Sequence, residues 1–232
     1  MASSKAWKST WGTIDWKHDP QEIVLQKVEQ LLASGADRHI NTRNIYGETV
    51  LVRSANMGYE SVVERLLAVP DIDVNAKNIY KNNALILASC GGYVGIVEKL
   101  LAFSDTDVNA KGCIGQTALI GAASNGRRDV VKKLLAFPKI NIRIKDDFGR
   151  TALDVARWNP KETKIIGMLK MVEIELKRRD FLRDEFRALR AEFSSDKMRK
   201  AIPNTAQRLR VRRSCVEHVK NVVGQIEYLT KA

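Results

Sequence analysis

The 232-residue sequence predicts an all-α repeat solenoid, in which helix-turn-helix units stack through β-hairpin loops, followed by a C-terminal helical hairpin. Two observations lead to this fold class. The segment from 44 to 145 repeats itself with a period of 34 residues, which is typical of stacked repeat arrays. Beyond 160 the repeat stops, but helical spacing of apolar residues continues. We therefore expect an N-terminal cap with a first partial repeat (1–43), a repeat domain (44–160) and a basic helical extension (161–232), whose first helix completes the last repeat.

Each repeat is predicted to contain two short helices. In the first block, Thr49 is placed to cap a helix, and Gly58 is placed to end it in the left-handed conformation. A second helix is expected from about 60 to 68, because its apolar residues fall on one face. These residues are Val62, Val63, Leu66 and Leu67, and the leucine pair recurs as Leu100-Leu101 and Leu134-Leu135.

The segment after each second helix contains ten or more turn-forming and β-branched residues without helical periodicity. Together with the two helices, it resembles the ankyrin-repeat pattern G-x-T-P-L-H-x-A-A-x-x-G-h-x-x-V-V-x-x-L-L, followed by D-V-N-A. The resemblance covers residues 22 to 170 in four in-phase copies. It implies a stack of ankyrin repeats whose concave face binds other proteins. The sequence departs from the pattern where proline and histidine are expected, and the second block has Lys81-Asn82-Asn83 in place of Gly-x-Thr.

The N-terminal region is predicted to close one end of the stack. Asp19, Pro20 and Glu22 resemble an N-cap, a proline in the first turn and a capping-box glutamate, and the helix they open should end at Gly35. The tryptophans upstream have two interpretations. They cover the exposed end of the solenoid, as terminal repeats require, or they form an aromatic anchor for a partner. These residues are Trp7, Trp11 and Trp16.

The C-terminal extension is predicted to form two amphipathic helices. The first spans 161–193, with a break in its apolar register near 177–180. The second lies within 207–229. Its stripe of Cys215, Val219, Val222, Ile226 and Leu229 is expected to pack back on the first helix, giving a monomer. A dimer formed through the same stripe is the alternative.

Charge is concentrated in this extension, which carries +8 of the formal net charge of +12. Such an excess favours acidic partners. The basic run is interpreted either as a solvated linker or as an anion-binding segment, which would make the protein a nucleic-acid or anionic-membrane binder. No aromatic residue interrupts it, which counts against base stacking. The candidate anion-binding residues are Lys197, Arg199, Lys200, Arg208, Arg210, Arg212 and Arg213.

The sequence shows no catalytic, metal-binding or cofactor motif. His18, His39 and His218 are isolated, and the three cysteines lack zinc-site or disulfide spacing. We therefore expect a non-enzymatic protein without cofactor or small-molecule substrate. With no signal peptide or apolar run of membrane-spanning length, we expect it in the reducing cytoplasm, with the nucleus or a host-cell cytosol as alternatives. The main hypothesis is an intracellular adaptor or scaffold, and an alternative of origin is a pathogen effector.

The best candidate for a functional surface is the row of hairpin tips together with the exposed side of the first helices. Large apolar residues recur at the tips, as binding hot spots require, unless their rings pack on neighbouring hairpins. The candidate protein-binding residues are Ile45, Tyr46, Asn56, Met57, Ile79, Tyr80, Ile114, Ser124, Asn125, Phe148, Arg150 and Trp158. Asn75 and Asn109 each follow Asp-Val and resemble the site of the asparaginyl hydroxylase that modifies ankyrin hairpins, although a structural role is the alternative.

Overall fold

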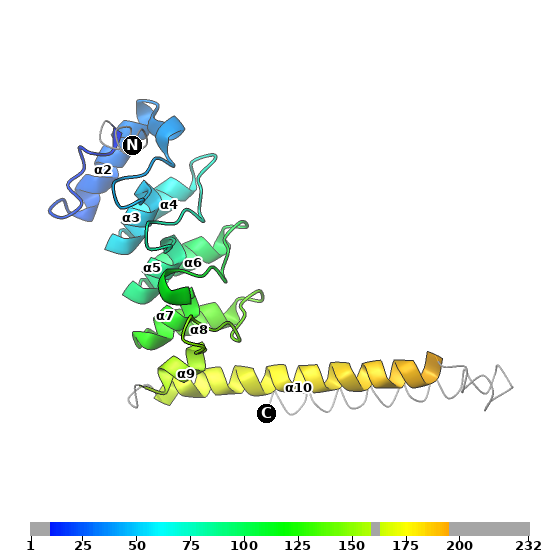
Figure 1. The fold of residues 1–232 in the computed structure, drawn as a ribbon. Helices are drawn as coiled ribbons and strands as arrows, with labels where there is room; N and C mark the ends of the chain where they lie inside the picture. The colour runs from blue at the N-terminus through cyan, green and yellow to red at the C-terminus, as the bar shows by residue number, and fades with distance from the viewer. Residues whose placement is uncertain (1–9, 159–162, 195–232) are drawn as a thin grey trace. The chain divides into compact units, whose positions relative to one another are not determined.

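The computed structural model describes residues 10–158 and 163–194 (Figure 1). By its contacts the chain divides into two compact units, Met1–Glu173 and Ile174–Ala232. The first unit is a stack of helix pairs. It opens with α2 (Gln21–Ala33) and the 3-10 turn η1 (Ala36–His39). The pairs that follow are α3 (Val50–Met57) with α4 (Glu60–Leu67), α5 (Ala84–Gly91) with α6 (Val94–Ala102), α7 (Ala118–Ser124) with α8 (Arg128–Ala136), and α9 (Ala152–Ala156) with α10 (Thr163–Ser194).

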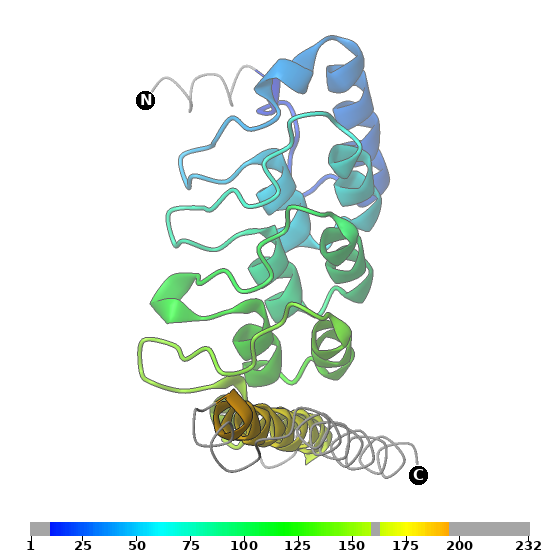
Figure 2. The same cartoon turned by 90° about the vertical axis from the view of Figure 1, so that its right-hand side faces the viewer.

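The repeats are arranged in layers, as Figure 2 shows. The hairpin loops stack on one side, α4, α6 and α8 stack on the other, and α3, α5 and α7 lie between them. Packing contacts connect adjacent repeats, α3 with α5, α5 with α7 and α7 with α9. Within the described residues the hairpins contain no strand. One of them contains a 3-10 turn, η2 (Cys113–Gly115). The predicted solenoid is thus confirmed.

Side-chain caps explain where the first helix of each pair begins. The side-chain oxygens of Thr49, Asn83 and Thr117 accept hydrogen bonds from the backbone N–H three residues later, at 3.0 to 3.3 Å. Thr151 does the same for α9 and forms a full capping box with Asp154. Asn83 therefore replaces the expected threonine without loss of the cap.

The predicted capping box of α2 is wrong. The helix follows Pro20 without any side-chain cap. The carboxylate of Asp19 is engaged elsewhere, because its Oδ2 accepts hydrogen bonds from the backbone N–H of Asp15 at 2.9 Å and from Lys27 Nζ at 2.5 Å. These bonds lower the pKa of Asp19, with that from Lys27 contributing most.

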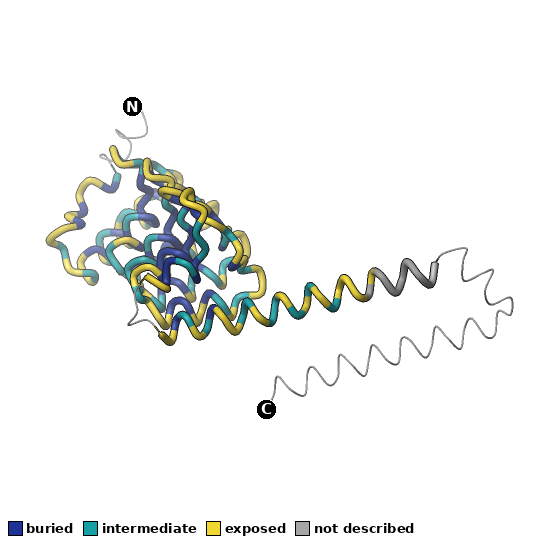
Figure 3. Tube along the Cα trace, turned by 60° about the horizontal axis from the view of Figure 1, so that its bottom comes forward, coloured by how far each residue is buried: buried dark blue, intermediate teal, exposed yellow. Residues whose placement is uncertain are grey.

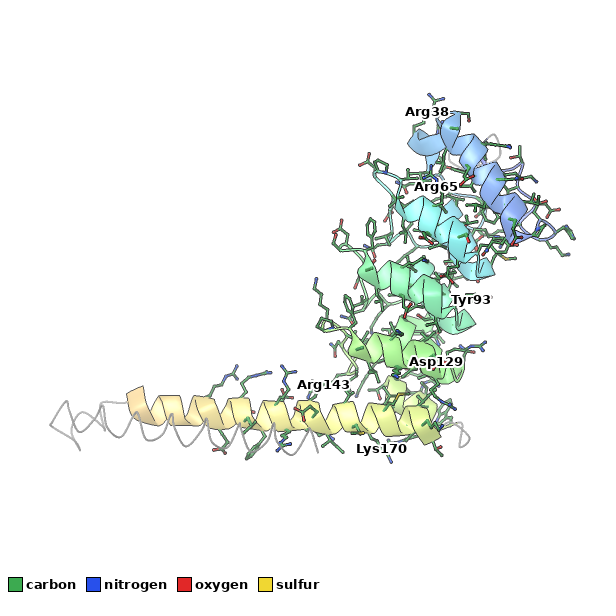
Figure 4. The ribbon with its side chains drawn as sticks, turned by 180° about the vertical axis from the view of Figure 1, so that it is seen from behind. Arg38, Arg65, Tyr93, Asp129, Arg143 and Lys170 are labelled. Atoms are coloured by element: carbon green, nitrogen blue, oxygen red, sulfur yellow. The ribbon has the colours of Figure 1, made fainter. Side chains whose placement is uncertain are left out.

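The core runs along the facing sides of the helices, seen as the dark segments of Figure 3. In the repeated leucine pairs the first member, Leu66, Leu100 or Leu134, is fully buried. The second member, Leu67, Leu101 or Leu135, is only half-buried, although the apolar pattern placed both on one face. On the outer side of the second helices, ion pairs join adjacent repeats, such as Lys99 Nζ with Glu64 Oε2 at 2.9 Å and Lys133 with Glu98. Figure 4 brings this side to the front, with Arg65 on α4 and Asp129 on α8 labelled.

Both ends of the stack are covered. Trp11 is fully buried and its indole N–H donates to the backbone oxygen of His39 at 3.2 Å. Trp16 is buried and stacks on Tyr59, with the ring centroids 6.4 Å apart. These two tryptophans confirm the capping interpretation, while Trp7 lies outside the described residues. At the other end, Ile165 and Leu169 of α10 are buried.

Helix α10 is unbroken from 163 to 194, including 177–180, where the apolar register changes. Its Met171, Ile174 and Phe181 are exposed. Among the described helices, none is both long and apolar enough to cross a membrane. The predicted second helix within 207–229 and the hairpin it would form lie outside the described residues.

Candidate functional site

Each hairpin tip is a closed turn held by the side chain of its first residue. In the first repeat, Asn44 Oδ1 accepts hydrogen bonds from the backbone N–H groups of Tyr46 and Glu48, both at 2.9 Å. The backbone N–H of Asn44 donates to the oxygen of Glu48 at 3.0 Å, and Gly47 completes the turn at a φ of 69°. The turn therefore forms its polar contacts internally and leaves the side chains of residues 45 and 46 outside.

The same turn recurs at Asn78 and at Asp146, whose Oδ1 atoms accept bonds from the residues two and four positions later. The third repeat is different because Gly112 has no side chain to supply these bonds. There Ile114 takes a positive φ of 50°, and the backbone N–H of Cys113 donates to Asn82 Oδ1 of the preceding repeat at 2.9 Å. A Cβ on Gly112 would lie 2.2 Å from that oxygen, so a larger residue there would displace the Asn82 side chain and break this bond.

Neighbouring tips are bonded to one another. The backbone N–H of Ile79 donates to the oxygen of Tyr46, and that of Asp147 donates to the oxygen of Ile114, both at 3.0 Å. These bonds fix the position of each tip relative to the next.

The tips present a row of exposed apolar side chains. Between 48% and 67% of each residue is accessible, so the neighbouring hairpins do not cover these side chains. Such a row is unusual on a folded surface, where large apolar groups are normally scattered singly. We call these residues the tip row: Ile45, Tyr46, Ile79, Tyr80, Ile114 and Phe148.

At the last tip, two aromatic rings enclose an arginine. The guanidinium carbon of Arg150 lies 4.6 Å from the ring centre of Phe148 and 4.6 Å from that of Trp158, which is 71% exposed. Arg150 also donates from Nε and Nη2 to Asp146 Oδ2, at 2.8 and 2.7 Å. The rings and the ion pair fix the arginine in place, which adds a rigid aromatic surface to the end of the tip row.

Burial alone would raise the pKa of the Asp146 carboxyl, but hydrogen bonds outweigh it and lower the pKa below its usual value. These bonds come from the Arg150 side chain and from the backbone N–H groups of Arg150 and Phe148. Asp146 is therefore a carboxylate at neutral pH, as the ion pair requires.

A row of basic residues accompanies the tip row, and the sequence analysis missed it. Lys77 Nζ donates to the backbone oxygen of Lys111 at 3.1 Å, and Lys111 Nζ donates to that of Lys145 at 2.7 Å. Arg43 makes the equivalent bond to the oxygen of Lys77. The signal was available, because a basic residue recurs at this position every 34 residues. We call Arg43, Lys77, Lys111 and Lys145 the basic row.

The remaining predicted binding residues lie at the C-terminal ends of the first helices. Asn56, Ser124 and Asn125 are exposed, and Met57 is half-buried. Asn125 Nδ2 donates to the backbone oxygen of Gly121 at 2.8 Å, so this amide also ends α7. Cys90 is close by and half-buried, and burial raises the pKa of its thiol.

The two candidate modification residues bridge adjacent repeats. Asn75 Nδ2 donates to the oxygen of Asp105 at 2.6 Å, and its Oδ1 accepts from the N–H of Asp107 at 2.8 Å. Asn109 makes the same two bonds to Lys139 and Asn141, at 2.8 and 2.9 Å. The contacts show a structural role for both side chains, and their hydroxylation stays a prediction.

The candidate anion-binding residues, from Lys197 to Arg213, lie outside the described part of the chain. Within that part, no group of three or more histidine, cysteine, aspartate or glutamate side chains could hold a metal ion.

A family model described as ankyrin repeats, in three copies, matches residues 24–112 and again 92–180. No curated protein matches the sequence.

Proposed function

The chain belongs to the ankyrin-repeat family, and from this premise we propose that it binds a partner protein through the tip row, as an adaptor or scaffold. Members of this family are generally protein–protein interaction modules and are typically non-enzymatic. The observation that carries the proposal is the exposed apolar row, which recurs in all four hairpins and is held by turns that are closed by hydrogen bonds. Because the turns are already ordered, little conformational entropy is lost on binding.

The place of action is part of the same proposal. We infer an intracellular, reducing compartment, since Cys90 and Cys113 are free thiols and Cys113 is exposed. Binding of nucleic acid or of an anionic membrane by the extension, and delivery as an effector, stay predictions. The first two depend on residues outside the described part of the chain, and the third depends on the origin of the protein.

The experiment compares the proteins captured by the full chain with those captured by a tip variant, Tyr46→Ser/Tyr80→Ser. Both side chains are exposed, so the variant should fold normally, and serine removes the apolar surface. We expect at least one captured protein to be lost, measured by quantitative mass spectrometry. That protein should then bind the purified wild type directly.

A matched control removes exposed apolar side chains elsewhere, as Ile23→Ser/Met171→Ser. It should capture the same proteins as the wild type. Equal capture by the wild type and the tip variant would refute the proposal.

A further inference from the structure

Within the four hairpins themselves the exposed charges are mostly positive. Next to them, Arg43 of the basic row is paired with the exposed Asp73, 4.0 Å away. The four hairpins (43–48, 77–82, 111–116 and 145–150) contain three carboxylates, and two of them are buried in ion pairs. Glu48 Oε2 lies 3.5 Å from Arg53 Nη1, and Asp146 is paired with Arg150. Asp147 is the one carboxylate of these hairpins that is exposed. Against it stand four exposed ammonium groups, those of Lys77, Lys81, Lys111 and Lys145.

The basic row is held in register with the tip row. Lys77 and Lys111 each donate to a backbone oxygen of the next repeat, 34 residues later. One such bond leaves two of the three ammonium hydrogens for another acceptor. Each repeat therefore offers an apolar contact and a cation, and both recur once in every repeat of 34 residues.

From this arrangement we propose that the partner segment is acidic, with apolar side chains that contact the tip row and carboxylates that contact the basic row. The inference rests on the proposed function and names the chemistry of its partner. Apolar contact excludes water from the neighbouring charges, which strengthens their attraction to carboxylates. The same charges disfavour basic segments, so they also select among partners.

Single-stranded nucleic acid is the other polymer that combines negative charge with flat apolar groups. The tip row fits it less well. Ile45, Ile79 and Ile114 are aliphatic and offer no ring on which a base could stack.

The test selects ligands from a displayed library of random peptides of about 20 residues, a length that spans about 30 Å as a helix. The library is first depleted on full-length Tyr46→Ser/Tyr80→Ser, which keeps the basic extension, and is then selected on the full-length wild type. Peptides retained only by the extension are removed in the first step. We expect the selected peptides to be rich in both aspartate or glutamate and large apolar residues.

The basic row is then tested with the selected peptides, using Lys77→Gln/Lys111→Gln. Glutamine removes the charge but keeps an N–H donor for the backbone oxygens. Binding should weaken about fivefold at low salt, because exposed ion pairs are individually weak, and the difference should shrink as salt is raised. The control, Arg128→Gln/Lys132→Gln on α8, makes the same change of charge at exposed positions and should bind like the wild type.

Three results would overturn the proposal while the proposed function survives. The selected peptides could be neutral or basic, they could bind Lys77→Gln/Lys111→Gln as tightly as the wild type, or an oligouridine probe could lose affinity in the tip variant. If the depleted library gives no peptide specific to the wild type, the proposed function fails as well.

Discussion

At the scale of single residues, Lys81 is in a conformation that suits glycine. Its φ is 63°, whereas the equivalent residues of the other three repeats are Gly47, Gly115 and Gly149 with φ from 69° to 76°. The left-handed conformation costs an L-residue roughly 1 to 2 kcal/mol, part of which is offset by the greater freedom of an unfolded glycine. We expect Lys81→Gly to raise the free energy of unfolding by about 1 kcal/mol, measured by urea denaturation.

The reverse change provides the control. A Cβ on Gly149 would have no atom within 4 Å, so Gly149→Ala reports the backbone conformation alone. This variant should lose about 1 kcal/mol. If neither substitution moves the denaturation midpoint, the tip conformations do not limit stability.

Asp146 links stability to pH. Its pKa in the folded protein is lowered from the usual 3.8, so its carboxylate stabilises the fold fully above that pH. The contribution is lost as the pH falls through the lowered pKa. Asp146→Asn should therefore be less stable at pH 7 by about 1 to 3 kcal/mol, with a difference that shrinks below about pH 4. Thermal unfolding followed across this range by circular dichroism measures it.

Asp147→Asn serves as the comparison, since it removes the exposed carboxylate of the next residue. At pH 7 it should unfold like the wild type. A difference between Asp146→Asn and the wild type that stays constant from pH 7 to pH 3 would show that the ionised carboxylate is not what stabilises the turn.

At the scale of the helices, the two leucines of each pair are not equivalent. Leu100 is fully buried, whereas Leu101 is half-buried. Leu100→Ala should cost about 2 to 5 kcal/mol, because it leaves a cavity, and Leu101→Ala should cost roughly half as much or less. Chemical denaturation of both variants tests this order. Equal losses would mean that the second leucine is as tightly packed as the first.

The sequence was sufficient for the helices because the same pattern appears in four copies. A cap such as Thr49 and a stop such as Gly58 recur at the same phase, so each copy supports the others. Asp19 shows where local pattern fails. It has the right spacing for a capping box, but the ammonium of Lys27, eight residues away, holds its carboxylate instead. The N-terminal helix occurs only once in the repeat pattern, so no equivalent helix was available to show that Lys27 would bind this carboxylate in place of the helix cap.

The sequence analysis predicted the residues of the tip row but missed the basic row. The exposure of Tyr46 and its counterparts follows from their position in a turn that bonds internally. The contacts of Lys77 and the placement of Arg150 between two rings depend on atoms that meet only after folding. The third tip could not be predicted either, because its turn at Gly112 is held by a hydrogen bond to the side chain of Asn82, which belongs to another repeat.

At the scale of the whole repeat stack, the terminal repeats need residues that cover their exposed ends. Trp11 is fully buried at the N-terminal end, and Trp11→Ala should cost about 3 to 5 kcal/mol there. Because repeats contact only their neighbours, the loss should be local. Hydrogen exchange should become faster in α2 and η1 and stay slow in α7. Trp158→Ala, which removes an exposed ring, should leave exchange in all three elements unchanged.

The side chains of Asn75, Lys77, Asn109 and Lys111 each form hydrogen bonds with the next repeat and with no repeat beyond it. Under a mechanical load applied to the two ends of the stack, these bonds carry the same tension in series. Extension should therefore proceed in steps, each releasing one repeat of 34 residues, or roughly 110 Å of extended chain. A bound partner that spans several tips would connect those repeats by a second path, in parallel with the bonds between them. The connected repeats should then unfold together instead of one at a time.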